Sequence, residues 1–294
     1  MKKLLLIFTF ILLHSAVFFA QNNTIEGVLV NSNTKKPLSY ANIFILNSNK
    51  GTTSDDDGYF SIESTDASKV LRFGYVGYHS KDLDFTKKQP DTISLVQNSE
   101  QLTEVIIIRP KFKKSIKIKG GKGKNNIGIS NTSNGDAPGA LLRYFEKPSE
   151  LGNEPAFLKS AEFYLYRGLE NDNRDYIFRI RVMSVAENGK PGYDLIENTT
   201  LKGKSGSKIS INLEDTAILI PKNGFFIGVE GLQIQQNYIE VQQIISSDGK
   251  TRKIKKYGPI FKGVETKNPI YYFGGGEWRK LKMPVPAINL ELTN

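Results

Sequence analysis

The chain has 294 residues, of which 40 are lysine or arginine and 30 are aspartate or glutamate, so its formal net charge at pH 7 is +10. It contains no cysteine and only two histidines, which excludes disulfide bonds and zinc centres of the cysteine and histidine type. The length is enough for two ordinary domains, and the composition predicts neither a metal ion nor a cofactor.

Residues 1–20 have the layout of a secretory signal peptide. Lys2 and Lys3 precede an apolar run from Leu4 to Leu13, and small residues lead to Ala20, after which we expect cleavage. The alternative is an uncleaved anchor, although the uncharged stretch is short for a membrane span. No later segment is apolar enough to cross a bilayer as a helix. We therefore expect export to the periplasm, the outer membrane or the medium.

Residues 21–98 alternate between apolar and polar side chains, with turn residues at short intervals. Candidate strands are TIEGVLVN, ANIFILN, GYFSIES, KVLRFGYV, YHSKDLDF and DTISLV. Short, even strands of this kind predict a small antiparallel sandwich. His79, the histidine that lies outside the signal, falls in one of these runs, where we expect a surface or half-buried side chain. It is the only histidine available there for a serine-type triad.

Three adjacent carboxylates, Asp55, Asp56 and Asp57, precede Gly58. Asp-Gly before alternating apolar residues is a strong hairpin signal, because the acid bonds to nearby backbone and glycine tolerates positive φ. An EF-hand calcium loop would need ligands at Thr53 and Ser64, which do not fit. A turn is the favoured interpretation, weak calcium binding is the alternative, and a catalytic acid pair lacks a visible partner.

The segment IEGVLVNSNTKKPLSYANIFILNSNKGTTSDDDGYFSI, followed by LRFGYVGYHSK, resembles the carboxypeptidase-D regulatory-like domain. This is a transthyretin-like sandwich of seven strands, found in proteins of the Gram-negative envelope. The matching residues include Gly27, Pro37, the Asp-Gly turn and the run from Gly74 to Tyr78. The resemblance implies a fold and an interaction role, and it supplies no catalytic residue.

Residues 99–135 are predicted to form a basic linker. In TonB-dependent receptors a similar domain precedes a segment that resembles residues 102–108, LTEVIII, and TonB grips that segment by strand addition. The alternative is a plain strand at the end of one domain or the start of the next. The basic residues that follow include Lys111, Lys113, Lys114, Lys117 and Lys119.

These lysines are either a solvated linker or an anionic-surface site for lipopolysaccharide phosphates. Nucleic acid is not an expected partner, because only Phe112 is interleaved with the charges. A second basic cluster, KTRKIKK at 250–256, follows Asp248-Gly249 and resembles a hairpin arm.

Residues 136–294 are also predicted to be β-rich and to form a larger, jelly-roll-like sandwich. The runs include FLKSAEFYLYR, DYIFRIRVMSV, SKISINL, AILIPKNGFFIGVEGL, PIYYFG and AINLEL. The pattern resembles secreted jelly-roll domains, in which FRIRV precedes a proline-glycine turn and a strand like that from Pro221 to Glu230. Alternation in FRIRV predicts one apolar face turned inward and charges turned outward.

The candidate ligand-binding residues are Trp278, the only tryptophan, with Glu277 and Arg279 beside it. A glycine-flanked aromatic ring with polar neighbours suits stacking on a sugar, and the alternative is an ordinary tryptophan at the edge of the core. Glu230 and Glu277 could form a glycosidase-type pair only if the fold brought them together.

We therefore expect an all-β, non-enzymatic binding or scaffold protein for a glycan or an envelope protein. The alternatives are a hydrolase that uses carboxylates alone and an adaptor of TonB-linked transport through residues 102–108.

Overall fold

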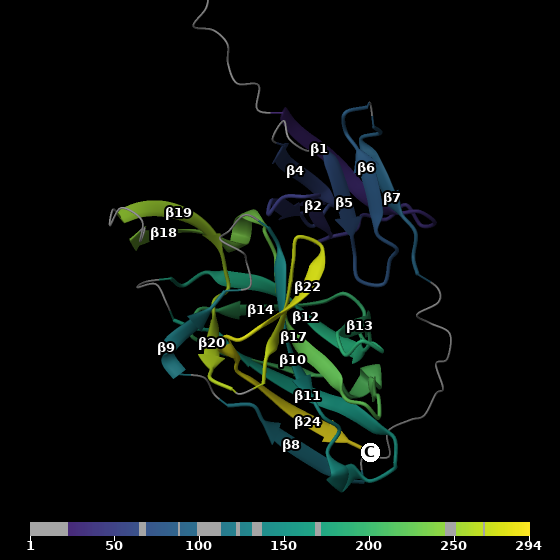
Figure 1. Ribbon diagram of the computed structural model, residues 1–294, viewed down its shortest axis with the longest axis vertical. Helices are drawn as coiled ribbons and strands as arrows, with labels where there is room; N and C mark the ends of the chain where they lie inside the picture. The colour runs from purple at the N-terminus through teal and green to yellow at the C-terminus, as the bar shows by residue number, and fades with distance from the viewer. Residues whose placement is uncertain are drawn as a thin grey trace, which may run out of the picture.

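The computed structural model describes residues 23–64, 69–87, 89–98, 113–121, 124–130, 137–167, 172–244, 251–266 and 268–294. These ranges fold as two β-rich bodies, stacked along the long axis of the molecule (Figure 1). Within these ranges no helix has the length and apolar character needed to cross a bilayer. The predicted signal peptide, Lys111 and residues 102–108 lie outside the described residues.

In its described part, the N-terminal body is a sandwich of a three-stranded sheet, in the order β4-β1-β7, and a four-stranded sheet, in the order β3-β2-β5-β6. The strands are β1 (Asn23–Asn31), β2 (Asn42–Ile45), β3 (Gly51–Thr53), β4 (Tyr59–Ser64), β5 (Val70–Gly74), β6 (Lys81–Asp84) and β7 (Thr92–Leu95). The prediction of a seven-strand sandwich is confirmed, but its strands are not all antiparallel, because β1 and β7 pair in parallel. The very short β3 is the strand that the residue pattern did not predict.

Alternation builds the core of this sandwich. In β4, Phe60 and Ile62 are buried while Tyr59 and Ser61 face solvent. The Phe60 ring meets Phe73 of β5 edge-on at 5.4 Å between centroids, which is the geometry that aromatic pairs prefer.

The three carboxylates form the predicted turn. Asp55 Oδ1 accepts hydrogen bonds from the backbone N–H groups of Asp57, at 3.0 Å, and Tyr59, at 2.9 Å. Gly58 has a φ of +75°, and a Cβ placed there would lie 2.5 Å from the carbonyl oxygen of Leu29. The turn therefore requires glycine at this position.

The larger C-terminal body is also a sandwich. Its seven-stranded sheet has the order β13-β12-β17-β10-β21-β22, with β14 also on β12, and faces a sheet ordered β15-β11-β24-β8, with β16 also on β11. The strands of these two sheets are β8 (Ser115–Lys119), β10 (Gly139–Phe145), β11 (Ala156–Tyr164), β12 (Asp175–Val185), β13 (Pro191–Asp194), β14 (Thr199–Lys204), β15 (Lys208–Asn212), β16 (Leu219–Ile220), β17 (Phe225–Gly231), β21 (Ile270–Gly274), β22 (Glu277–Leu281) and β24 (Ile288–Thr293).

One large core lies between these two sheets. Phe163 of β11 and Phe178 of β12 meet edge-on at 6.0 Å between centroids. A small sheet of β23 (Val285–Pro286), β20 (Phe261–Val264) and β9 (Lys124–Ile129) closes one side, where Phe261 contacts Phe178 at 5.1 Å. The all-β, jelly-roll-like prediction is confirmed for the described residues.

The basic stretch is not a solvated linker throughout, and this corrects the prediction for residues 99–135. β8 pairs with β24, and β9 pairs with β20. Ile116 and Ile118 pack against the large core, while Lys117 and Lys119 are exposed. The physical reason is the alternation in Ser-Ile-Lys-Ile-Lys, which gives β8 one apolar face to bury despite its charge.

Candidate functional site

The predicted ligand site at Trp278 is not assembled as expected. Trp278 faces Phe273 across the β21–β22 hairpin, and their ring centroids are 5.0 Å apart. Successive side chains on a strand point to opposite faces, so Glu277 and Arg279 lie on the other face of β22. The strand therefore does not bring these three side chains to one surface.

Trp278 instead packs at the edge of an apolar cluster on the outer face of the seven-stranded sheet. The buried centre of this cluster is Leu142, Met183 and Phe226, and Trp278 is partly buried against it. A sugar could stack on only part of a ring packed in this way. The geometry favours the core-edge interpretation, and the ligand role of Trp278, Glu277 and Arg279 stays a prediction.

The β21–β22 hairpin also contacts the N-terminal sandwich. Phe273 meets Phe44 of β2 edge-on at 5.7 Å. A Cβ placed on Gly275, in the hairpin turn, would lie 3.7 Å from the carbonyl oxygen of Ser48. Phe44, Phe273 and Trp278 thus form a row of rings from one sandwich to the other.

Beside these rings lies a buried group of charges that the sequence did not indicate. Arg179 of β12 and Glu230 of β17 form an ion pair whose side chains are 1% and 0% exposed. Arg181 donates from Nη1 to Glu230 Oε2 at 2.6 Å. Its Nε and Nη2 donate to the two carboxylate oxygens of Asp194, at 2.6 and 2.7 Å. We call Arg179, Arg181, Asp194 and Glu230 the ionic cluster.

The N-terminal sandwich covers the ionic cluster. Asn42 of β2 donates from Nδ2 to Glu230 Oε1 at 2.6 Å, and Arg179 donates to the carbonyl oxygen of Tyr40. Further along the contact, Asn198 Nδ2 donates to the Tyr75 hydroxyl at 2.7 Å. The FRIRV prediction was therefore half right, since its arginines do leave the large core but are buried between the two bodies.

Glu230 stays ionised in this setting. Burial alone would raise the pKa of its carboxyl, but the charges of Arg179 and Arg181 and the donated hydrogen bonds lower it to about 2. Burial alone would lower the pKa of the Arg181 guanidinium, but the carboxylates of Asp194 and Glu230 hold it above its usual value. A carboxylate held in this state is a hydrogen-bond acceptor and cannot donate a proton near neutral pH.

The glycosidase-type pair is also ruled out by geometry. β10 and β21 lie between β17, which carries Glu230, and β22, which carries Glu277. Three strand spacings amount to about 14 Å, beyond the roughly 5–9.5 Å that paired glycosidase carboxylates need. Glu230 is enclosed, whereas Glu277 is exposed. His79 is exposed as well, in agreement with its predicted surface position.

The predicted anionic-surface lysines differ in their surroundings. Lys113 is exposed, and Lys114 donates from Nζ to the carbonyl oxygen of Glu150 at 2.7 Å. Lys117 and Lys119 project from the outer face of the sheet β15-β11-β24-β8. Neither has an ion-pair partner among the described residues.

Next to these two lysines the outer face holds a connected polar group. Lys208 donates to Glu162 Oε1 at 2.7 Å, and Tyr164 and Asn289 donate to Glu162 Oε2 at 2.9 and 3.2 Å. The hydrogen bond from Lys208, followed by that from Asn289, lowers the pKa of Glu162 to about 2. Lys159 lies 3.1 Å from Glu291. Glu162 and Glu291 on this face are thus paired with Lys208 and Lys159. Lys117 and Lys119 are left as exposed cations without an ion-pair partner among the described residues.

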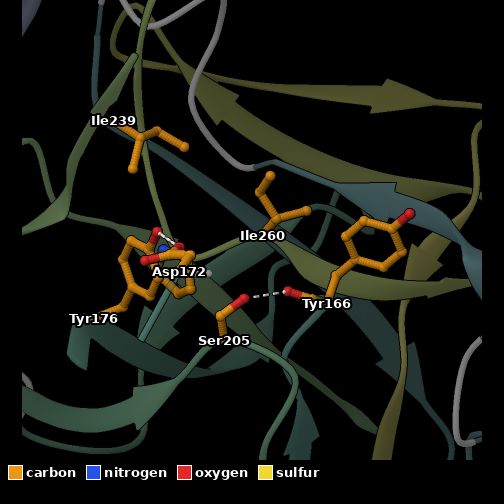
Figure 2. A pocket seen from close by; sticks show the side chains of 7 residues that line it. Tyr166, Asp172, Tyr176, Ser205, Ile239 and Ile260 are labelled. Carbon is orange, nitrogen blue, oxygen red and sulfur yellow. Dashed lines mark hydrogen bonds between the residues drawn. The ribbon is translucent and has the colours of Figure 1, made fainter. Parts of the chain in front are cut away.

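Figure 2 shows a cavity near the base of a projecting hairpin, lined by Tyr166, Asp172, Tyr176, Ser205, Ile239, Pro259 and Ile260. Tyr176 donates to Asp172, and Ser205 Oγ donates to the carbonyl oxygen of Tyr166 at 3.1 Å. The cavity volume is about 10 Å³, room for one water molecule at most and not for an organic ligand. Among the described residues, no group of three or more His, Cys, Asp or Glu side chains is placed to hold a metal ion.

Comparison with known proteins identifies the class of the first body. Residues 25–107 match the family model of the CarboxypepD_reg-like domain. The N-terminal sandwich is therefore a carboxypeptidase regulatory-like domain, in agreement with the resemblance noted in the sequence.

Among curated proteins, the chain is similar to two receptors of Formosa agariphila. It is 29% identical to TonB-dependent receptor P3 over 102 residues, which are 35% of this chain and 10% of the receptor. It is 44% identical to TonB-dependent receptor P26 over 69 residues, which are 23% of this chain and 7% of the receptor. The matches thus span a tenth or less of the length of these relatives.

Two solved structures of Cwp84, a surface-layer-associated protein of Clostridium difficile, are distantly similar. One, of the cysteine protease and lectin-like domains, has 13% identity and a TM-score of 0.31 over 53% of this chain and 32% of that chain. The other, of the cysteine protease after propeptide cleavage, has 11% identity and a TM-score of 0.36 over 86% of this chain and 65% of that chain. Scores this low establish no common fold.

Proposed function

We propose that this chain is a non-catalytic binding or scaffold protein of the bacterial envelope, which binds an acidic glycan on the outer face of the sheet β15-β11-β24-β8. The signal-like N-terminus and the similarity to TonB-dependent receptors support an exported, outer-membrane-associated location. The ionic cluster supports the scaffold role, because it ties the two sandwiches together through buried hydrogen bonds.

The observation that carries the ligand class is the pair of open cations at Lys117 and Lys119. They lie beside Glu162, whose carboxylate is 32% exposed and can accept hydrogen bonds from sugar hydroxyls. Tyr164 and Asn289 hold this carboxylate in place. Exposed ion pairs contribute only about 0.2–1 kcal/mol each, so binding would rest on several contacts along a polymer and weaken with salt.

The test is affinity electrophoresis of residues 21–294 in gels that contain polygalacturonate or neutral dextran. Retardation by the acidic polymer alone is expected, with a several-fold loss in the variant Lys117→Ala/Lys119→Ala. The matched control is Lys202→Ala/Lys204→Ala, which removes two alternate exposed lysines from β14. Equal retardation of the wild type and the Lys117/Lys119 variant, or equal loss in the control, contradicts the glycan site.

The non-catalytic assignment has its own test. The purified chain is screened against polysaccharides and ester substrates, and no turnover is expected. Turnover that Glu277→Gln abolishes would overturn the assignment and revive the carboxylate hydrolase.

A second candidate is an adaptor of TonB-linked transport through residues 102–108. The specific observation is that the family match extends to residue 107, and the relatives are themselves TonB-dependent receptors. A pull-down with TonB should recover the wild type and not Val105→Pro, because proline cannot donate the backbone hydrogen bond of an added strand. Equal recovery of both would remove this candidate.

A further inference from the structure

A two-stranded hairpin stands apart from both sandwiches. β18 (Tyr238–Ile244) and β19 (Thr251–Tyr257) pair with each other and, within the described part of the chain, with no other strand. In Figure 1 this hairpin, which we call the arm, projects to one side of the larger sandwich. It confirms the hairpin predicted from the basic cluster at 250–256.

The base of the arm is firmly held. Asn237 is fully buried, and its Nδ2 donates to the carbonyl oxygens of Ile177, at 2.6 Å, and Leu232, at 2.9 Å. The backbone N–H of Gly258 donates to the Asn237 carbonyl at 2.8 Å, and Arg174 donates to the Tyr238 carbonyl. An isolated two-stranded ribbon is marginal in water, so this base fixes the direction of an element that packs little beyond it.

The arm carries an excess of positive charge. β19 contains Arg252, Lys253, Lys255 and Lys256, whereas β18 contains the single acid Glu240. Lys253 is 72% exposed, and its Nζ is 3.7 Å from Glu240, which is itself 52% exposed, so this pair is weak. Lys255 and Lys256 have no ion-pair partner among the described residues.

The side chains of β19 place positive charge on both faces of the hairpin. Alternation puts Lys253 and Lys255 on one face, and Ile254 and Lys256 on the other. At the base, Tyr238 and Tyr257 meet edge-on at 5.9 Å. Lysines on both faces suit a layer of lipid phosphates that contacts the ribbon.

We infer that the arm docks on the anionic surface of a phospholipid bilayer, with lipid phosphates as the ligands of Lys253, Lys255 and Lys256. This surface is separate from the glycan face, which lies on β8 and its neighbours, and it does not depend on the proposed glycan. Near an anionic bilayer each lysine lowers the free energy of binding to the surface, which raises the partition coefficient between bilayer and water about fivefold.

The experiment is co-sedimentation of residues 21–294 with vesicles of phosphatidylcholine, with and without phosphatidylglycerol. Binding is expected only to the anionic vesicles and should decline as salt increases. Lys253→Gln/Lys255→Gln/Lys256→Gln should lower the partition coefficient about a hundredfold, which is the product of three such losses. Circular dichroism confirms that the variant keeps its β-sheet spectrum.

Matched controls separate the arm from total charge and from the glycan face. Two control variants should sediment with vesicles nearly as well as the wild type. They are Lys202→Gln/Lys204→Gln and Lys117→Ala/Lys119→Ala. The inference is overturned if the arm variant partitions like the wild type, or if the controls lose as much. Arm-dependent binding to soluble polyphosphate without vesicle binding would also overturn it, since it would assign the arm to a free polyanion.

Discussion

Glu230 is a carboxylate whose role is set entirely by its neighbours. Its strand, Phe225–Gly231, is buried along its whole length, and an unpaired charge at such a site would be strongly unfavourable. Two arginines and the Asn42 amide offset that penalty. Because Asn42 lies in the other sandwich, the ionised carboxylate of Glu230 also stabilises the contact between the two sandwiches.

Replacing Glu230 with glutamine should destabilise the protein by about 3 kcal/mol, because it leaves the buried guanidinium of Arg179 without an anion. Arg181 loses one of its two carboxylates and keeps Asp194. Urea unfolding followed by the fluorescence of Trp278 measures this change. Glu277→Gln is the control, with an expected change within about 0.5 kcal/mol because Glu277 is exposed. A neutral effect of Glu230→Gln would mean that the ionic cluster does not hold the junction.

The same variant gives a prediction for pH. The pKa of Glu230 is lowered to about 2 in the folded protein, and an unfolded glutamate titrates near 4.3. Its contribution is therefore complete above about pH 5 and is lost as the pH falls toward 2. The difference in unfolding free energy between wild type and Glu230→Gln should shrink across that window. A difference that stays constant from pH 7 to pH 2 would contradict the lowered pKa.

Gly58 and Gly77 offer a matched pair of backbone tests. Both have positive φ, +75° and +78°, but a Cβ at Gly77 meets nothing within 4 Å, whereas one at Gly58 meets the Leu29 carbonyl. Gly77→Ala should cost about 1 kcal/mol from backbone strain alone. Gly58→Ala should cost about 2 kcal/mol or more, because the close contact adds to the strain. Equal costs in chemical denaturation would show that the chain relaxes around Gly58.

At the level of single elements, β8 decides whether the basic stretch is a strand or a linker. Ile118→Ala should lower the unfolding free energy by about 1–2 kcal/mol, because a partly buried side chain leaves the core. Lys117→Ala, one residue away on the other face, should change it by no more than about 0.5 kcal/mol. If both substitutions are neutral in urea unfolding, the segment is solvated after all.

The elements that the sequence predicted are those specified by local signals. Asp55 to Gly58 encode their turn in four residues, and β4 encodes its buried face by alternation. β8 has the same alternation, but its many lysines favoured the prediction of a solvated linker. Its two isoleucines nevertheless face the core. The short β3 carries too few residues for any period to show.

The junction could not be predicted in this way. Asn42 and Glu230 are 188 residues apart, and their contact exists only once each strand has its register and the two sandwiches have met. Arg179 and Arg181 looked like ordinary outward charges, since nothing in their own strand shows that a second body covers them. The signal available was weak: two arginines at alternate positions opposite a single glutamate in an otherwise apolar strand.

For the whole molecule, the junction predicts coupled unfolding of the two sandwiches. Phe44 is the best test of this coupling, because its ring points away from the N-terminal core and contacts Phe273. Its neighbours Ile43 and Ile45 point into that core. Calorimetry of the wild type should give a single transition. Phe44→Ala combined with Asn42→Ala should split it in two and enlarge the radius of gyration in solution scattering.

The control for this pair is Ile43→Ala, which should lower the transition temperature without separating the transitions, because it damages the core and spares the contact between bodies. Two transitions already present in the wild type would show that the sandwiches unfold independently. In that case the ionic cluster would be a local feature of the larger sandwich, and the scaffold role would lose its structural basis. The proposals for the glycan face and the arm would be unaffected, because they rest on residues outside the junction.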